Sequence, residues 1–398
     1  MLSNYSLRNF TVVSFCIALW AFLFIAPYSM YHVISILPIC LLPCLKFFVQ
    51  KQYAIESVKQ CAVFFLSWSI IFFASIANGV FPAPVNFILL LCSSVYLISS
   101  QDERRDIAEL FLRGYTLVLA ISLVEYFLYL AGFSLQLGTV VRPGVVVYQY
   151  IQLPFNLIQE STGGIGVTRF QSLVNEPGLV GTLNALLLYN IDRKAYMKEY
   201  IILILTGLFT ASLAFYLLFT FYIITSLKSV KAIGASLVVV LLIYTLYVFN
   251  QDHPTVRYMQ YRIELGEDAD NRTSDQFENL YAQFKNSDSK WLGNGLDSVS
   301  QMKISDGGND GVKKITFEVG YIGIFLLLLS YTYIICRNRQ TFPKRIVFLI
   351  VFWMSFYQRA GILFPYYALV IAMPYLGERR LMVNRMSLKK NSMTTKIN

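Results

Sequence analysis

Residues 61–78 read CAVFFLSWSIIFFASIAN and contain no charged side chain. A helix rises about 1.5 Å per residue, so a block of this length spans nearly all of a hydrocarbon core of roughly 30 Å. Apolar blocks of similar length recur from one end of the sequence to the other. The pattern predicts an all-α fold, a polytopic membrane helix bundle that forms a single integral membrane domain over residues 1–398.

The composition of the chain also indicates that lipid is its solvent. Of the 398 residues, 56% are hydrophobic and 14% are charged, and the mean hydropathy is +0.54. Soluble domains carry charges at about a quarter of their positions. The deficit of charge therefore favours a membrane protein over a soluble one.

Cysteine and histidine usage gives no sign of a metal or haem centre. The six cysteines lie in or beside apolar stretches, at Cys16, Cys40, Cys44, Cys61, Cys92 and Cys336. Only Cys40 and Cys44 are close enough to share a metal, and no second pair completes a site. The two histidines, His32 and His253, are far apart. We expect no metal and no cofactor, and we interpret the cysteines as small core residues.

Hydropathy divides the chain into about 12 transmembrane spans. They are predicted at 10–27, 31–48, 61–78, 85–100, 107–131, 178–191, 200–212, 213–227, 233–249, 319–336, 346–358 and 362–377. The first follows Met1–Arg8 without a small-residue cleavage site after it, so we expect a retained span and not a signal peptide. Residues 200–227 have an alternative interpretation as one long helix.

Basic residues decide between one helix and two at 200–227. Two crossings place these residues on one side: Arg8, Lys46, Lys51, Lys59, Arg104, Arg105, Arg193, Lys194, Lys198, Lys228, Lys231, Arg337, Arg339, Lys344, Arg345 and the basic tail after 378. A single crossing would move Lys228 and Lys231 outside and invert every later loop. Short cytoplasmic loops carry an excess of Lys and Arg, so the charges favour both termini in the cytoplasm. The basic cytoplasmic loops of this orientation account for the net charge of +10, which therefore does not indicate nucleic-acid binding.

Two large segments, 132–177 and 250–318, fall outside the membrane in this topology. The first is rich in Gly and Pro, and its apolar stretches 145–147 and 153–158 predict that it dips into the membrane or packs over the bundle. The second is polar, with a short helix predicted at Ser274–Phe284. Loops longer than about 15 residues are usually functional or disordered, so we look for chemistry here.

The first loop ends in the sequence TRFQSLVNEPG, residues 168–178, directly before a predicted span. Pro177 suits a first helical turn, and Asn175 or Glu176 is a candidate cap. The N-terminus of a helix favours an anion, and the planar fork of Arg169 suits a pyrophosphate. The structural alternative is that Glu176 caps the helix and that Arg169 pairs with it.

The second loop carries a comparable series of short motifs. It contains DNRT at 270–273, the predicted helix, WLGNGL at 291–296 and TFEVGYIG at 316–323, which leads into the next span. Taken singly, Gly293 and Gly295 are turn glycines, and Gly320 and Gly323 are close-packing glycines.

The order of these motifs resembles the O-antigen polymerase and O-antigen ligase superfamily of bacterial envelope glycan assembly. The resemblance covers roughly residues 165–325 by motif and the rest by number of spans. It implies functional arginines in two periplasmic loops, here Arg169 and Arg272, which hold the pyrophosphate of a polyprenyl-linked sugar donor. It also implies a bacterial inner (cytoplasmic) membrane location.

One departure from the family pattern separates its two branches. The ligase branch typically has a histidine about ten residues before the ExGxxG glycine, whereas this chain reads NDGVKK at 309–314. The difference favours a polymerase that joins undecaprenyl-pyrophosphate-linked repeat units into O-antigen or a similar surface polysaccharide. Glu176 is the first candidate for its general base and Glu318 the second, with a helix-end cap as the structural alternative for Glu318.

Further arginines extend the predicted pyrophosphate site. Arg142 lies in the first loop, Arg257 and Arg262 lie in the second, and Arg359 lies in a short outer turn between two spans. Each has the alternative of an ordinary loop charge. Glu125, inside the fifth span, is expected to make an inward-facing polar contact.

Two other functions remain open from the sequence. An O-antigen ligase would transfer the glycan to lipid A-core, and a transporter or flippase of lipid-linked glycans would have the same span count. The expected partners are the polyprenyl-pyrophosphate-linked oligosaccharide and membrane lipid, with a chain-length regulator protein as a further candidate and no nucleic acid.

Overall fold

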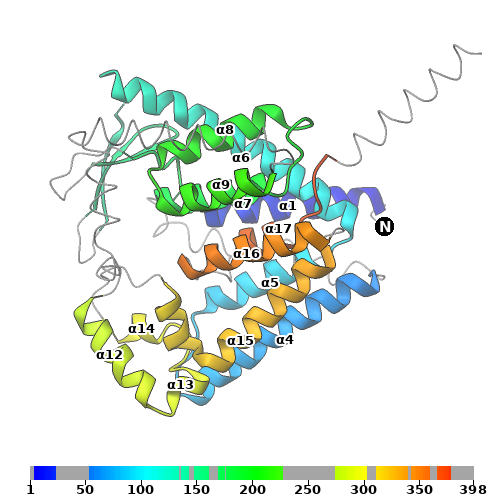
Figure 1. Ribbon diagram of the computed structural model, residues 1–398, viewed down its shortest axis with the longest axis vertical. Coiled ribbons are helices and arrows are strands. Elements are labelled where there is room, and N and C mark those ends of the chain that lie inside the picture. Colours follow the sequence, from blue (N-terminus) through cyan, green and yellow to red (C-terminus); the bar gives the residue numbers. More distant parts are fainter. Residues whose placement is uncertain are drawn as a thin grey trace, which may run out of the picture.

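The computed structural model describes residues 4–23, 53–133, 136–142, 148–160, 169–174, 176–226, 274–302, 311–338, 342–358 and 365–377. Its helices are α1 (Asn4–Leu23), α4 (Ile55–Ala77), α5 (Pro84–Ile98), α6 (Gln101–Leu130), α7 (Pro177–Leu188), α8 (Met197–Phe209), α9 (Leu213–Ser226), α12 (Asp275–Asn286), α13 (Ser289–Leu292), α14 (Ser298–Gln301), α15 (Val312–Asn338), α16 (Phe342–Gln358) and α17 (Pro365–Ala372), as Figure 1 shows. Three short strands, β1 (Gly138–Arg142), β2 (Tyr148–Gln152) and β3 (Leu157–Glu160), lie between α6 and α7.

Helices long and apolar enough to cross a membrane confirm the membrane character of the chain. By length and composition, α4, α6 and α15 meet this condition, and shorter apolar helices include α5, α7 and α9. The count of about 12 spans stays a prediction. The predicted spans 31–48 and 233–249 lie outside the described residues.

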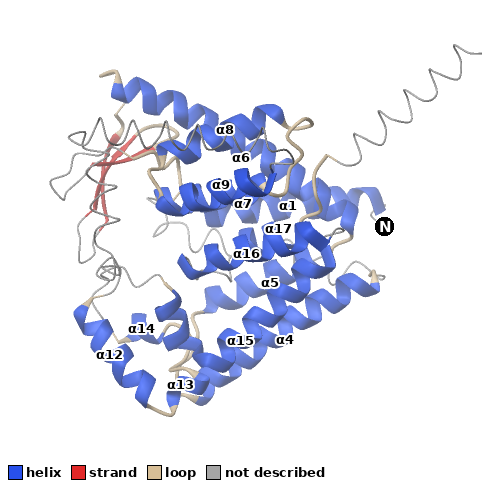
Figure 2. Cartoon of the chain, viewed as in Figure 1, coloured by secondary structure: helices blue, strands red, loops and turns tan. Residues whose placement is uncertain are grey.

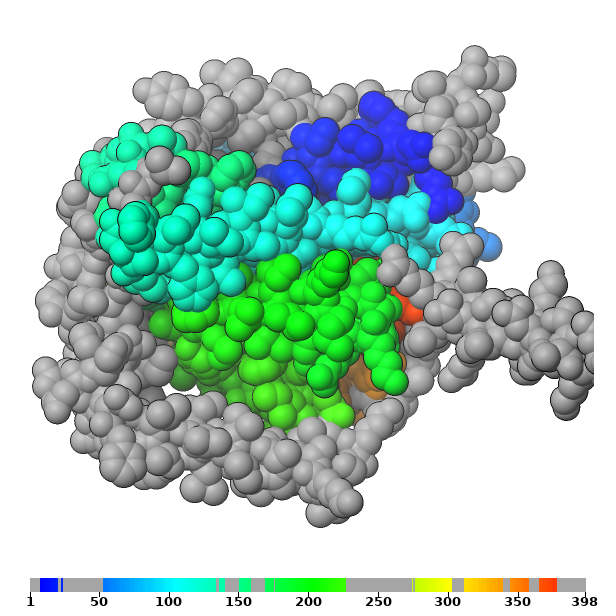
Figure 3. All heavy atoms as spheres, turned by 90° about the horizontal axis from the view of Figure 1, so that it is seen from above, coloured from blue at the N-terminus to red at the C-terminus, as the bar shows by residue number. Residues whose placement is uncertain are grey.

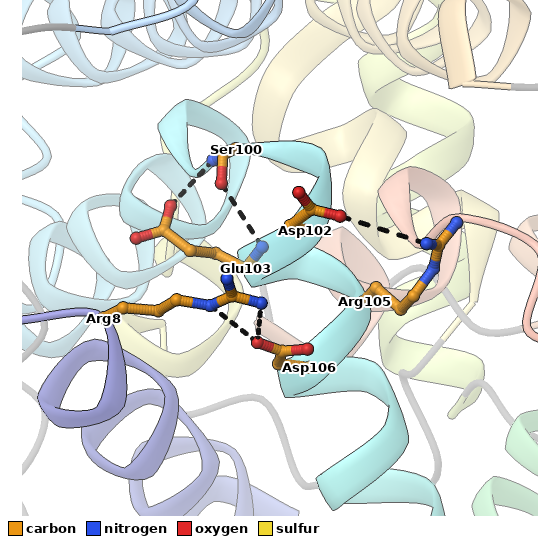
Figure 4. A network of polar contacts seen from close by, with 6 residues as sticks. All are labelled: Arg8, Ser100, Asp102, Glu103, Arg105 and Asp106. Atoms are coloured by element: carbon orange, nitrogen blue, oxygen red, sulfur yellow. Dashed lines mark hydrogen bonds and ion pairs between the residues drawn. The ribbon is translucent and has the colours of Figure 1, made fainter. Parts of the chain in front are cut away.

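The α6 helix begins at Gln101, earlier than the predicted span at 107, because its first turn is polar but well capped. Ser100 accepts a hydrogen bond from the Glu103 amide, and the Glu103 carboxylate accepts one from the Ser100 amide. This reciprocal capping box satisfies two amides that the helix leaves unpaired. In the second turn of α6, Asp106 pairs with Arg8 of α1, with Nε of the arginine 2.8 Å from the carboxylate (Figure 4).

Residues 200–227 form two helices and not one long helix, as the charge distribution predicted. The break falls at Thr210–Ser212, where Ala211 adopts a positive φ of 46°. Tyr200 near the start of α8 and Tyr222 near the end of α9 have ring centroids 6.2 Å apart. The chain therefore doubles back on itself, and both helices pack on α7.

The helices share one continuous apolar core. α4 packs on both α5 and α15, and α5 packs on α17 (Figure 1). On the other side, α6 lies between α1 and α8, as the space-filling view shows with α6 in cyan (Figure 3). α16 and α17 contact helices of both groups, so the bundle is continuous.

A buried arginine joins four helices at one end of the bundle. The Arg104 side chain is 1% exposed. Its guanidinium donates to the Gln60 side chain on α4 at 2.8 Å and to the Asn338 side chain on α15 at 3.0 Å. It also donates to the carbonyls of Tyr96 and Leu97, in the last turn of α5. A cation there satisfies carbonyls that the helix end leaves unpaired.

Both large loops lie at the opposite end of the bundle. α4 and α6 both start at the Arg104 end, because Ser57 donates to the Ser99 carbonyl and Gln60 binds Arg104. They therefore end together, α4 next to the α12–α14 segment and α6 next to the strands. Figure 2 shows both segments on the left, away from the N-terminus. The described parts of the two loops thus share one end, and the side of the membrane that this end faces stays a prediction.

The all-α expectation is wrong for the first large loop. Residues 138–160 form a three-stranded antiparallel sheet in the order β1-β2-β3, with Val140 opposite Tyr150 and Ile151 opposite Ile158. These β-branched and aromatic side chains favour strands. Each strand is too short to form an apolar block of the length of a span, so the hydropathy of the sequence does not predict it.

The second loop contains the helix that the sequence predicted. α12 begins after Ser274, whose side chain accepts a hydrogen bond from the Phe277 amide. Phe277, Tyr281 and Phe284 pack with Phe317 of α15 in a small second core. Burial raises the pKa of the Tyr281 hydroxyl above its ordinary value.

Candidate functional site

Arg169 is held against the turn between α8 and α9. Its Nε donates to the Thr210 carbonyl at 2.9 Å and its Nη2 to the Ala211 carbonyl at 3.4 Å. The next residue continues the contact, since the Phe170 amide donates to the Phe209 carbonyl at 3.0 Å. The side chain is partly exposed. A permanent positive charge is therefore fixed at the loop end of the bundle.

The turn between α8 and α9 can approach Arg169 because α7 has a glycine at the point where this turn contacts α7. A Cβ atom built on Gly181 would lie 2.9 Å from Cβ of Phe215 and 3.0 Å from Oγ1 of Thr210. Both distances are below ordinary van der Waals contact. Gly181 thus sets how closely the turn, and the two carbonyls that hold Arg169, approach α7.

Glu176 occupies the N-cap position of α7, with Pro177 in the first helical turn as predicted. Its backbone is extended, with φ −150° and ψ 141°, and its carbonyl accepts from the Leu179 amide at 3.0 Å. Within the described residues, its carboxylate makes no capping hydrogen bond to the helix. Glu176 therefore caps α7 through its backbone carbonyl and not through its side chain. The role of the side chain stays a prediction.

The apolar stretch 153–158 of the first loop packs over the bundle, one of the two arrangements predicted for it, and the stretch 145–147 lies outside the described residues. Ser122 of α6 contacts the Ser172 hydroxyl at 2.7 Å and also donates to the Phe155 carbonyl. The buried Asn156 side chain donates to the Ser122 carbonyl at 3.1 Å. Ser172 has a positive φ of 57°.

Glu125 binds this same loop. Its carboxylate accepts from the Phe155 amide, with oxygen–nitrogen distances of 2.9 and 3.2 Å. The expected polar contact of Glu125 is therefore with the loop, one turn above Ser122 on α6. Ser122 and Asn156 are missed from the sequence, where their only signal is a polar residue near the end of an apolar block, because burial is visible only in the structure.

The two glycine motifs of the second loop meet each other. Gly293 and Gly320 both have positive φ, 80° and 72°. A Cβ atom on Gly293 would lie 2.6 Å from the Gly320 nitrogen, and one on Gly320 would lie 2.6 Å from the Leu292 carbonyl carbon. The Asn294 and Gly295 amides donate to the Phe317 and Glu318 carbonyls, both at 2.9 Å. Gly293 and Gly320 are therefore parts of one junction. They are not a separate turn glycine and packing glycine, as each would be if taken singly.

The same junction is tied to the turn between α4 and α5. The Asn78 side chain donates to the Gly293 carbonyl at 2.9 Å. The Asp297 carboxylate accepts from the Ala83 amide at 2.8 Å and from the Asn86 side chain at 2.7 Å. Asp297 has a positive φ of 65°, which aspartate tolerates better than most residues. Asn78 and Asp297 were not selected from the sequence.

Glu318 lies in this junction, two residues before the kink of α15 at Gly320. Its side chain is buried, and its carbonyl accepts from the Gly295 amide. Because non-helical Gly320 interrupts α15, Glu318 lies in the last turn of the short helical segment that starts at Val312. The roles of its side chain as a general base or as a helix-end cap stay predictions.

The other predicted site residues are not brought together here. Arg142 is the last residue of β1. The Arg142 side chain and the whole of Arg257, Arg262, Arg272 and Arg359 lie outside the described residues. Their part in a pyrophosphate site stays a prediction. In the parts of the chain that the structure describes, no three His, Cys, Asp or Glu side chains gather as a metal site would require.

A scan of the chain against protein-family models found no match, and a search of curated proteins found none either.

Proposed function

We propose that this protein is an integral membrane glycosyltransferase that polymerises polyprenyl-pyrophosphate-linked oligosaccharide repeat units into a surface polysaccharide. The reaction would take place at the periplasmic face of the bacterial inner membrane. The observation that carries the proposal is the position of Arg169, a guanidinium held by two carbonyls at the end of an apolar bundle that also carries both large loops.

The chemistry of the proposed substrate suits this arrangement. Its carrier is a long isoprenoid, which partitions into lipid, and its pyrophosphate is an anion at the membrane surface. An arginine fork recognises phosphate oxygens more strongly than a point charge does. The N-terminus of α7, the positive end of its helix dipole, lies at the same end of the bundle.

In the proposed reaction, a hydroxyl oxygen at the non-reducing end of an incoming repeat unit attacks the anomeric carbon of the growing chain. The bond from that carbon to the pyrophosphate oxygen breaks, and the electron pair leaves with polyprenyl pyrophosphate. The hydroxyl proton passes to a base, for which Glu176 is the candidate. Positive charge at the leaving group stabilises the transition state, which is usually the largest contribution.

Deletion of the gene in its host, followed by a gel of the surface polysaccharide, tests the reaction class. Loss of a polymerase leaves the core with a single repeat unit. Loss of a ligase leaves no attached units, and loss of a flippase leaves lipid-linked units on the cytoplasmic side. Complementation by the wild-type gene should restore the ladder, while either of the other two patterns would contradict the polymerase assignment.

A further inference from the structure

After the kink, one face of α15 is apolar and exposed from Ile322 to Leu329. Ile322, Phe325 and Leu329 are 42%, 59% and 52% exposed. Their spacing of three and four residues places them on one side of the helix. In a helix apolar enough to span a membrane, such a stripe faces lipid.

The second loop extends this stripe beyond the kink. Trp291 and Leu292 of α13 are 54% and 50% exposed. The Trp291 ring packs edge-on against Tyr321, the first residue after the kink, with centroids 6.1 Å apart. The apolar surface therefore passes without a break from the span to α13.

The geometry of α15 sets the depth of Trp291. The segment from Gly320 to Asn338 measures about 27 Å at 1.5 Å per residue, close to the roughly 30 Å of a hydrocarbon core. Arg337 lies at its far end. Gly320 therefore marks one edge of the core, and the close contact between Gly320 and Leu292 holds α13 at that edge.

The residues of α13 have the chemistry of this interface. Tryptophan and tyrosine are enriched at head-group depth, where an amphipathic ring has one apolar and one wet side. The Lys290 ammonium lies 6.0 Å from the Trp291 ring centroid, and a lysine at this depth buries its stem while its charge reaches the phosphates.

We propose that Trp291 and Leu292 insert into the head-group region of the lipid bilayer and anchor the second loop to the membrane surface. The anchor requires only a membrane-embedded bundle and is independent of the glycan chemistry proposed above. Because α13 leads directly into Gly293, the lipid contact also holds the junction with Gly320 at the level of the phosphates.

Tryptophan quenching in lipid vesicles tests the insertion. The full-length protein and the Trp291→Phe variant are reconstituted in phosphatidylcholine and phosphatidylglycerol, and the difference in fluorescence isolates the emission of Trp291. Lipids brominated near the head group or near the chain end quench from within the bilayer, and iodide quenches from water. Trp353→Phe, on α16, supplies the matched difference for a partly buried tryptophan that packs against the apolar core.

We expect the emission of Trp291 to be quenched most by bromines near the head group, less by those near the chain end, and little by iodide. Quenching by iodide without quenching by either brominated lipid would place Trp291 in water and overturn the anchor. Protection from both kinds of quencher would also overturn it, since another protein surface would then cover α13.

Discussion

Gly293 and Gly320 pack backbone against backbone, and this contact joins the second large loop to the kink of α15. Both residues have positive φ, and neither has room for a side chain. Two separate motifs in the sequence are therefore one structural unit. Its role is to fix the position of the loop relative to the spans.

Replacement of either glycine by alanine should loosen this junction. Positive φ alone costs an L-residue about 1–2 kcal/mol, and here the new methyl group would also collide with backbone atoms. We expect Gly293→Ala and Gly320→Ala to lower the melting temperature in detergent and to expose the loop to proteolysis. Gly132→Ala is the matched control, since Gly132 has φ 85° with open space around it, and an equal loss there would contradict a special junction.

At the other end of the bundle, replacement of Arg104 should lower the stability of the protein more than replacement of any neighbouring cation. Arg104→Ala leaves the buried Gln60 oxygen and the carbonyls of α5 without their donor, and each buried unsatisfied group costs roughly 1–3 kcal/mol. We expect a marked fall in thermal stability. The neighbour Arg105 makes only a partly exposed pair with Asp102, so Arg105→Ala should change stability by less than about 1 kcal/mol. Equal thermal stability of the two variants would contradict a structural role for Arg104.

Arg169 and Arg272 are predicted to act on the same phosphate-bearing substrate. Alanine at either position should abolish polymer while the protein still reaches the membrane. Lysine should rescue only partly, because an ammonium keeps the charge but loses the planar fork that binds two oxygens. Arg193→Ala is the control, since Arg193 lies over the ring of Tyr200 near the start of α8, away from the loops. Normal amounts of polymer in both alanine variants would show that the reaction does not depend on these two arginines.

Glu176→Gln should be made in normal amounts yet give little or no polymer. The carboxylate makes no capping bond to α7 among the described residues, so the substitution should leave the helix intact. Loss of a positioned general base costs roughly 10²–10⁴-fold in rate. Glu109→Gln removes a carboxylate that pairs with Arg113 on α6 and should have no such effect. Polymerisation at a near-normal rate would show that the reaction does not need the Glu176 carboxylate.

Cysteine reporters test the orientation of the two loops. Reporters at Ser161 and Ser287 should react with an impermeant thiol reagent added from outside. One at Ser229 should react only after permeabilisation, because basic loops stay in the cytoplasm. The parent protein, with its own cysteines, supplies the background. Outside labelling at position 229 would contradict the prediction of about 12 spans and move the second loop to the cytoplasm.

Local sequence was sufficient for much of the helical architecture. Apolar blocks near the length of a bilayer predicted α4, α6 and α15, which are long and apolar enough to cross a membrane. The basic residues predicted the reversal between α8 and α9, and the helix predicted at Ser274–Phe284 is present as α12. These features depend on hydropathy, charge and capping, which act within a few residues of one another.

Tertiary packing decided the contacts between motifs. The sheet in the first loop forms because three short strands pair, and none is long enough to predict alone. Arg169 donates hydrogen bonds to the Thr210 and Ala211 carbonyls, and Gly293 packs against Gly320. Both contacts join residues that are far apart in the chain. Such contacts depend on how helices pack and not on neighbouring residues, so a single sequence identifies the glycines and arginines without showing which of them meet.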